Sequence, residues 1–204
     1  MAKGTITVRV DGLDILKEIK DEFFLAPKGL EAATNRALNH ALNAVRAEGV
    51  RISREKYTAK ARALRTAIKI RRVSVINVTG SVFFSGRVGV PAGEFQIRPR
   101  KLPKWKGVRP RDRKPEAGIV AQFIKEGGFS VVKGPHDEKS FLLMHDGRLS
   151  VWYRRSKTEG LRKLFGPSPI QALQPEEARE RLMNHGQQDF RTQLANQVKR
   201  LFSK

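Results

Sequence analysis

The sequence predicts an α+β fold in which N-terminal helices and a long C-terminal helix flank an antiparallel β-sheet or small barrel. Apolar residues recur at helical spacing near both ends of the chain, over 27–72 and within 160–204. β-Branched and aromatic runs separated by turn residues fill 73–154, with a basic, proline-rich arm at 98–114. The 204 residues suit one compact domain, so we expect a single domain over 1–204.

The N-terminal segment predicts a strand and two helices. Residues 5–10 alternate apolar and polar side chains, which is typical of a half-buried strand. Leu13–Phe24 carries one apolar stripe and predicts a short amphipathic helix. Pro27 suits the first turn of a longer helix that extends to about Ser53. The apolar stripe of this helix is rich in alanine, so we expect a helix or sheet to approach it closely. The stripe consists of Leu30, Ala33, Ala37, Ala41, Val45 and Ile52.

A basic segment follows this helix. Thr58 is a suitable N-cap for a second helix that extends through Arg71. Between Arg54 and Arg72 there are eight basic residues and one acidic residue, Glu55. We interpret the cluster as a contact with a polyanion or partner, and the alternative is a solvated helix face. The candidate residues are Arg62, Arg65, Lys69, Arg71 and Arg72.

Several short strands are predicted in the middle of the chain. Glycine-containing turns separate them, and Asp146-Gly147 is the strongest two-residue hairpin signal. Gly127-Gly128 is expected to join another strand pair. The expected strands lie within Val73–Phe84, Val88–Val90, Ile119–Ile124, Phe129–Val132, Phe141–His145 and Arg148–Arg154.

Between those strands lies the basic arm, Arg98–Lys114, with nine basic residues, three prolines and one acid. Because such a composition does not suit a helix or a central strand, we expect a long loop that becomes ordered on a partner. Trp105 could stack on a nucleic-acid base or attach the arm to a neighbouring subunit. The candidate contact residues are Arg98, Arg100, Lys101, Lys104, Trp105, Lys106, Arg109, Arg111, Arg113 and Lys114.

The overall charge indicates a polyanionic partner. Lys and Arg number 41 against 20 Asp and Glu, which gives a formal net charge of +21. Such a field attracts polyanions and makes binding depend strongly on salt, but it does not distinguish nucleic acid from an acidic protein. There is no cysteine, which excludes disulfides and thiolate zinc sites. We see no signal peptide or membrane-spanning stretch, so a soluble protein without a membrane partner is expected.

The C-terminal region, 160–204, predicts a turn and then a helix. Gly166-Pro167 is interpreted as a fixed turn. Pro175, Glu176 and Glu177 mark a helix start, with the acids at the positive end of the helix dipole. Its apolar stripe consists of Ala178, Leu182, Phe190, Leu194, Val198 and Leu201.

No catalytic chemistry is indicated by the sequence. The four histidines are scattered without metal-ligand spacing, and His136-Asp137-Glu138 is expected to be an exposed loop. Neither a phosphate-binding loop nor a nucleophile elbow is present. We therefore expect no catalytic, metal-binding or cofactor-binding residues.

Two segments resemble a known family. One is the alanine-rich helix that continues into a basic segment, from Arg36-Ala37-Leu38-Asn39 to Ala67–Arg72. The other, which is more specific, is Leu164–Leu173 with its Phe165-Gly166-Pro167-Ser168 motif. Both are similar, in this order, to the minor tail protein Z family of long-tailed bacteriophages. The likeness covers roughly 28–72 and 160–202, and Pro169-Ile170-Gln171 departs from the family, where proline more often directly precedes the glutamine.

The resemblance implies a structural virion protein without catalysis or cofactor. Such a protein completes the head-proximal end of the tail, so that the head can join and DNA can enter the tube. It implies a homo-oligomeric ring, other tail or neck proteins as partners, and non-specific contact with DNA. The location implied is the virion, with the host cytoplasm during assembly.

Two other functions are compatible with the residues. A cellular nucleic-acid-binding protein, such as a ribosome-associated factor, would share the basic composition and the extended arm. A nuclease would need converging carboxylates and a divalent metal, for which the sequence has no local pattern.

Overall fold

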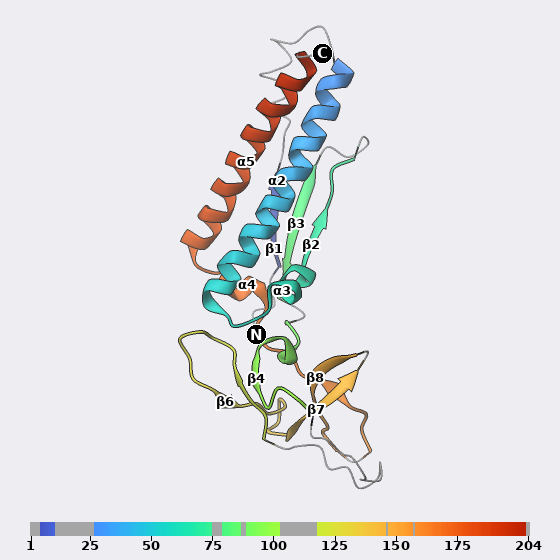
Figure 1. The fold of residues 1–204 in the computed structure, drawn as a ribbon, viewed down its shortest axis with the longest axis vertical. Coiled ribbons are helices and arrows are strands. Elements are labelled where there is room, and N and C mark those ends of the chain that lie inside the picture. Colours follow the sequence, from blue (N-terminus) through green and yellow to red (C-terminus); the bar gives the residue numbers. More distant parts are fainter. Residues whose placement is uncertain are drawn as a thin grey trace. The chain divides into compact units, whose positions relative to one another are not determined.

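The protein mixes helices with antiparallel strands, which confirms the predicted α+β class (Figure 1). In the described part of the chain, the strands form three three-stranded sheets in the orders β1-β3-β2, β4-β5-β6 and β7-β8-β9. The described strands therefore build small open sheets, and the predicted alternative of a barrel is not seen among them. The structure is a computed structural model that describes residues 5–10, 27–74, 79–86, 89–102, 118–145, 147–156 and 158–202.

The chain divides into two compact units, each built from segments that are not adjacent in sequence. Unit 1 comprises Met1–Ser53, Arg65–Arg87 and Pro169–Lys204, and unit 2 comprises Arg54–Leu64 and Val88–Ser168. This division was not predicted from the sequence, because its boundaries interrupt the long helical segment and the basic segment. The single domain over 1–204 stays a prediction.

Helix α2, Pro27–Lys56, is the longest element of the structure and confirms the helix predicted from Pro27. All six residues of its predicted apolar stripe are buried. The expected close approach of a sheet is also present. An added Cβ at Gly49 would lie 2.5 Å from the Phe84 ring, and one at Gly80 would collide with Leu42. Backbone without side chains at these two points lets the helix and the sheet pack tightly.

The sheet beside α2 consists of β1 (Thr5–Val10), β3 (Gly80–Ser85) and β2 (Ile68–Arg71). Strand β3 lies between the other two and pairs antiparallel with both. The predicted strand at 5–10 is confirmed. Val73, predicted to be in a strand, lies outside β2 and β3. Its N–H donates to the Asn39 side-chain oxygen (3.0 Å), and its carbonyl oxygen accepts from the Asn39 side-chain amide (3.2 Å). The helix predicted at Leu13–Phe24 falls outside the described residues.

The second predicted helix is only partly correct. Helix α3 covers Ala61–Ala67, and the chain then continues as strand β2. Ile68 is buried as predicted, but in a strand, because Ile-Lys-Ile-Arg also satisfies a period of two. Thr58 does not cap α3. Its hydroxyl donates instead to the carbonyl oxygen of Gln122, within unit 2.

Helix α5, Glu176–Phe202, confirms the predicted C-terminal helix, and the short helix α4, Pro169–Ala172, precedes it. Leu182, Phe190 and Leu194 of its predicted stripe are buried, whereas Leu201 is exposed. Helices α2 and α5 lie side by side (Figure 1). They are in close contact at Gly186, where an added Cβ would lie 2.6 Å from a Val45 methyl group.

A carboxylate connects these two helices. Glu48 of α2 is 3% exposed, and its oxygens lie 2.8 Å from Arg51 Nη2 and 2.8 Å from Arg181 Nε of α5. A buried carboxylate is costly without partners, so the two guanidinium groups compensate for its lost hydration. A second link joins His40 Nδ1 to Asp189 Oδ2 at 2.7 Å, nearer the solvent.

Two small sheets and a short helix build unit 2. The first sheet contains β4 (Gln96–Arg98), β5 (Val120–Gln122) and β6 (Ser130–Val131). The second contains β7 (Ser140–His145), β8 (Arg148–Tyr153) and β9 (Arg162–Lys163), with the 3₁₀ helix η1 at Ala92–Glu94. The predicted strand pairs on either side of Gly127-Gly128 and of residues 146–147 are confirmed, and Gly147 has the positive φ of 68° that such a turn needs. The core of unit 2 consists of Ala92, Ile97, Ile119, Ala121, Val132, Leu142, Val151 and Leu164.

Replacement of the buried carboxylate tests the link between the two helices. Glu48→Gln keeps the shape but loses the charge-assisted bonds to both arginines, so unit 1 should lose about 1–3 kcal/mol of stability. Urea unfolding followed by the helical circular-dichroism signal measures this change. The matched control, Glu31→Gln on the exposed side of α2, should change stability by less than about 0.5 kcal/mol. Equal effects of the two variants would contradict the role assigned to Glu48.

Candidate functional site

The basic residues predicted between 54 and 72 do not form one helix face. Arg62 and Arg65 lie on α3, Lys69 and Arg71 on β2, and Arg72 follows that strand. All five are exposed. The prediction of a single basic helix is therefore wrong, because the segment changes from helix to strand at Ile68. The unit boundary falls between Leu64 and Arg65, which assigns Arg62 to unit 2 and the other four to unit 1.

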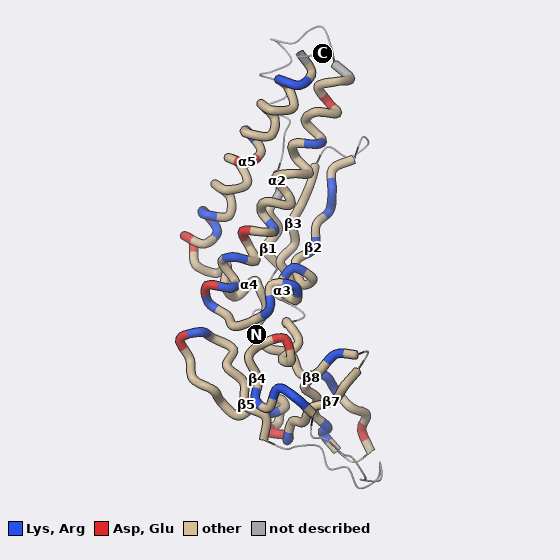
Figure 2. The backbone as a smooth tube through the Cα atoms, in the orientation of Figure 1, with Lys and Arg blue, Asp and Glu red and all other residues tan. Residues whose placement is uncertain are grey.

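On β2 the basic residues share one side of the strand. Alternate residues of a strand point to opposite faces, and Ile68 is buried on the other side. Lys69 pairs with Phe83 of β3, and Arg71 pairs with Ser81. The sheet thus fixes the two cations two residues apart on one side of β2. Figure 2 shows basic positions along this strand.

The first residue of the predicted arm, Arg98, lies in a strand. Arg98 is the last residue of β4, and its guanidinium lies 4.2 Å from the centre of the Phe129 ring. This cation–π contact attaches Arg98 to its own unit, so its assignment to a free loop was wrong. Arg100 and Lys101 follow and are exposed. The remaining candidates lie outside the described residues: Lys104, Trp105, Lys106, Arg109, Arg111, Arg113 and Lys114.

The motif Phe165-Gly166-Pro167-Ser168 is extended and does not form the predicted turn. The Gly166 N–H donates to the Val90 carbonyl oxygen at 2.8 Å, and the Val90 N–H donates to the Pro167 carbonyl oxygen at 3.2 Å. Phe165 also forms an antiparallel bridge with Pro91. Extended backbone satisfies its polar groups by pairing, and the partner here is the distant segment 90–92. Val88–Val90 was predicted as a strand. Of its described residues, Val90 makes the two backbone bonds to Gly166 and Pro167, next to the Pro91–Phe165 bridge, but none belongs to a named strand.

Two glycines make this pairing possible because they have no side chain. An added Cβ at Gly89 would collide with the Gly166 carbonyl oxygen. At Gly166 it would lie 2.7 Å from the Phe123 ring and 2.8 Å from the Phe95 ring. These two rings pack edge to face with their centroids 5.0 Å apart. Sequence reasoning missed Gly89, Phe95 and Phe123 as partners of the motif. The signal that could have indicated them is the run of glycines at 86, 89 and 93.

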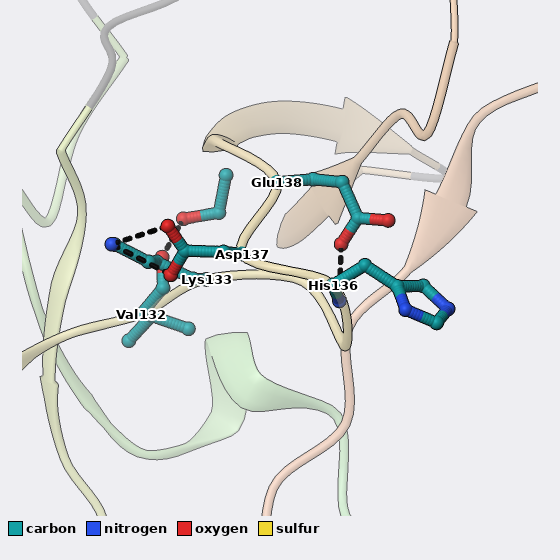
Figure 3. Close-up of polar contacts among 6 residues, drawn as sticks. Val132, Lys133, His136, Asp137 and Glu138 are labelled. Atoms are coloured by element: carbon teal, nitrogen blue, oxygen red, sulfur yellow. Dashed lines mark hydrogen bonds and ion pairs between the residues drawn. The ribbon is translucent and has the colours of Figure 1, made fainter.

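In the loop at His136-Asp137-Glu138, His136 and Asp137 are exposed, as predicted, whereas Glu138 is half-buried. Figure 3 shows polar contacts of this loop. Lys133 Nζ lies 2.7 Å from Asp137 Oδ1, and the His136 backbone N–H donates to Glu138 Oε2 at 2.8 Å. Burial acts to raise the pKa of Glu138, but this bond and neighbouring positive charge lower the pKa below its ordinary value. Such contacts stabilise a turn and leave no convergent ligand set.

No group of three or more His, Asp and Glu side chains is placed to hold a metal ion within the described part of the chain. In the same part, no helix is long and apolar enough to cross a membrane. The described candidate contact residues are exposed lysines and arginines, which offer a cationic, hydrogen-bonding surface. Unit 2 carries 22 Lys and Arg against 9 Asp and Glu, a net +13, and unit 1 carries 19 against 11, a net +8. Both units can therefore attract a polyanion.

Comparisons of this chain with models of known families, with curated proteins and with solved structures find no match. The likeness to the minor tail protein Z family stays a prediction based on the two quoted segments.

The packing of the motif can be tested at its glycine. Gly166→Ala would force a methyl group against two rings, and such overpacking costs about 1–3 kcal/mol. Because both tryptophans of the chain belong to unit 2, urea unfolding followed by tryptophan fluorescence reports this unit. Gly128→Ala is the matched control, since nothing lies within 4 Å of its added Cβ. The packing would be refuted by a Gly166→Ala protein as stable as this control.

Proposed function

We propose that this protein is a structural, non-enzymatic part of a bacteriophage virion that completes the head-proximal end of the tail. In this role it would enable head–tail joining and the entry of DNA into the tail tube. It would act as a homo-oligomeric ring in contact with other tail or neck proteins, in the virion and, during assembly, in the host cytoplasm. Contact with DNA would be non-specific.

The observation that supports the proposal is the structural use of the most family-like segment, Leu164–Leu173. Its first part pairs with 90–92 inside unit 2. Its second part contributes Ile170 and Leu173 to the buried residues of unit 1. The segment is thus the part of the chain that passes from unit 2 into unit 1, and it is packed in both. A role in architecture, without chemistry, is what a virion component requires.

The positive charge is compatible with this role. A ring at the head end of a tail lies beside DNA during its passage, and a basic surface lowers the repulsion that DNA meets in a narrow opening. The arm residues outside the described part of the chain would, on this proposal, contact DNA or an acidic neighbour when the ring assembles.

A cellular nucleic-acid-binding protein is the second candidate, and the net charge of +13 in unit 2 favours it. Light scattering of the full chain separates the two functions. The chain is measured alone, with short duplex DNA, and with tail proteins, over a salt series. A closed oligomer, or one formed only with tail proteins, is expected. A stable monomer that binds nucleic acid tightly and never assembles would overturn the proposal.

The contribution of the arm is tested in infectious particles. A variant with Lys104, Lys106, Arg109 and Arg111 replaced by Gln should lower the yield of infectious phage by at least tenfold. The matched control replaces four exposed cations of α5 by Gln, namely Arg179, Arg191, Lys199 and Arg200. This control removes the same net charge and should leave the yield within about twofold. Normal yield with the arm variant would refute the role of the arm.

The enzymatic alternative is a nuclease, which requires a divalent metal. Incubation of the protein with magnesium or manganese and with single-stranded or duplex nucleic acid should give no cleavage. Cleavage that co-purifies with the chain and disappears on metal removal would contradict the non-enzymatic proposal.

A further inference from the structure

The sheet β1-β3-β2 has two unlike faces. On one face the buried Val82 and Phe84 of β3 lie beside Val8 of β1 and Ile68 of β2. This face packs against α2, as the contact between Gly49 and the Phe84 ring shows. Alternate residues of all three strands must therefore point away from α2.

The register assigns the residues of the other face, which we call the open face. Thr7 of β1 and Lys69 of β2 both pair with Phe83 of β3. Two residues from Phe83 in one direction along β3, Arg71 pairs with Ser81, and two residues in the other direction Thr5 pairs with Ser85. Since paired residues in antiparallel strands point to the same side, these side chains share one surface. The described side chains of the open face belong to Thr5, Thr7, Lys69, Arg71, Ser81, Phe83 and Ser85.

The groups that reach solvent on this face are hydrogen-bond donors. Thr5, Thr7, Lys69 and Arg71 are exposed, whereas Ser81 is buried and Phe83 is half-buried between them. No acidic residue occurs in β1, β2 or β3. Lys69 and Arg71 lie about 7 Å apart along their strand, and Thr7 lies two strands away from Lys69, at about 10 Å. Thr5 and Arg71 lie at opposite ends of the face, so the two rows are offset. The surface thus presents a row of cations parallel to a row of hydroxyls.

We propose that the open face binds the sugar-phosphate backbone of duplex DNA. Lysine, arginine and threonine are side chains that contact phosphate oxygens, and such contacts position a protein without reading sequence. The distance between the two cations, about 7 Å, is close to the rise of two base-pair steps along the axis of duplex DNA. An acidic protein partner fits less well, because protein interfaces have an apolar centre and this face offers only the half-buried Phe83.

This inference goes beyond the tail-completion role and does not depend on it. A cellular nucleic-acid-binding protein could use the same face, and a tail protein could form its ring without it. Failure of the assembly experiment above would therefore leave this proposal intact, and failure of the experiment below would leave the ring intact.

The test is fluorescence-anisotropy titration of a labelled 30-base-pair duplex with the full chain over a salt series. Each phosphate contact contributes about 0.9 to the slope of log K against log salt. This slope is negative, so Lys69→Gln with Arg71→Gln should reduce its magnitude by about 2. The matched control is Arg179→Gln with Arg191→Gln, two exposed cations of α5 in the same unit. It removes the same charge and should leave the slope unchanged.

A second variant distinguishes direct contact with DNA from long-range attraction by the net positive charge. Thr5→Val with Thr7→Val keeps the β-branched shape and the charge but removes both hydroxyls. DNA binding should weaken about fivefold for each hydroxyl, with the salt slope unchanged. Circular dichroism and the unfolding midpoint check that each variant is folded. If the charge variant fails to fold, the DNA affinity of the valine variant still tests whether the open face contacts DNA.

Three results would overturn the proposal. Equal losses of slope in the β2 and α5 charge variants would mean that DNA senses only the net charge. Unchanged affinity in the valine variant would mean that the open face is not in contact. Tighter binding of poly-glutamate than of the duplex at equal salt, lost in the β2 variant, would mean that the face serves an acidic protein.

Discussion

The close approach of α2 to the sheet β1-β3-β2 is the constraint on which unit 1 depends. It exists because Gly49 and Gly80 have no side chain where Phe84 and Leu42 must fit. Tight packing at these points buries the apolar face of the sheet and excludes water from it. With one face committed to α2, the period of two leaves every intervening residue on the other side. The basic and hydroxyl surface is therefore a direct consequence of the helix–sheet contact.

The second long helix is held by a different kind of interaction. Gly186 of α5 allows close contact with Val45, and Arg181 reaches across to the buried Glu48. Apolar contact supplies the adhesion, and the ion pair adds directionality, since a buried carboxylate accepts only a narrow range of donor positions. In unit 2 an analogous task falls to Gly89 and Gly166, where two extended segments meet without side chains between them.

Most helices and hairpins were predictable because their signals are local. The α2 stripe, the β7–β8 hairpin and the acidic start of α5 each depend on neighbouring residues in sequence. The end of the segment 58–71 was mispredicted because Ile68 fits both the helical spacing from Leu64 and the alternation of a strand. Gly166-Pro167 was mispredicted as a turn because the same dipeptide is compatible with extended backbone when a partner segment is present.

The sequence by itself determined the fold class, the net charge of +21 and the apolar stripes of the long helices. Only the tertiary structure decided which basic residues share a face. Lys69 and Arg71 come together with Thr5 and Thr7 through pairing with β3, and this pairing joins residues that lie far apart in the chain. The family-like motif likewise became an extended element through its bonds to Val90. Composition and periodicity are sums over near neighbours, whereas strand register is a long-range contact that no local pattern contains.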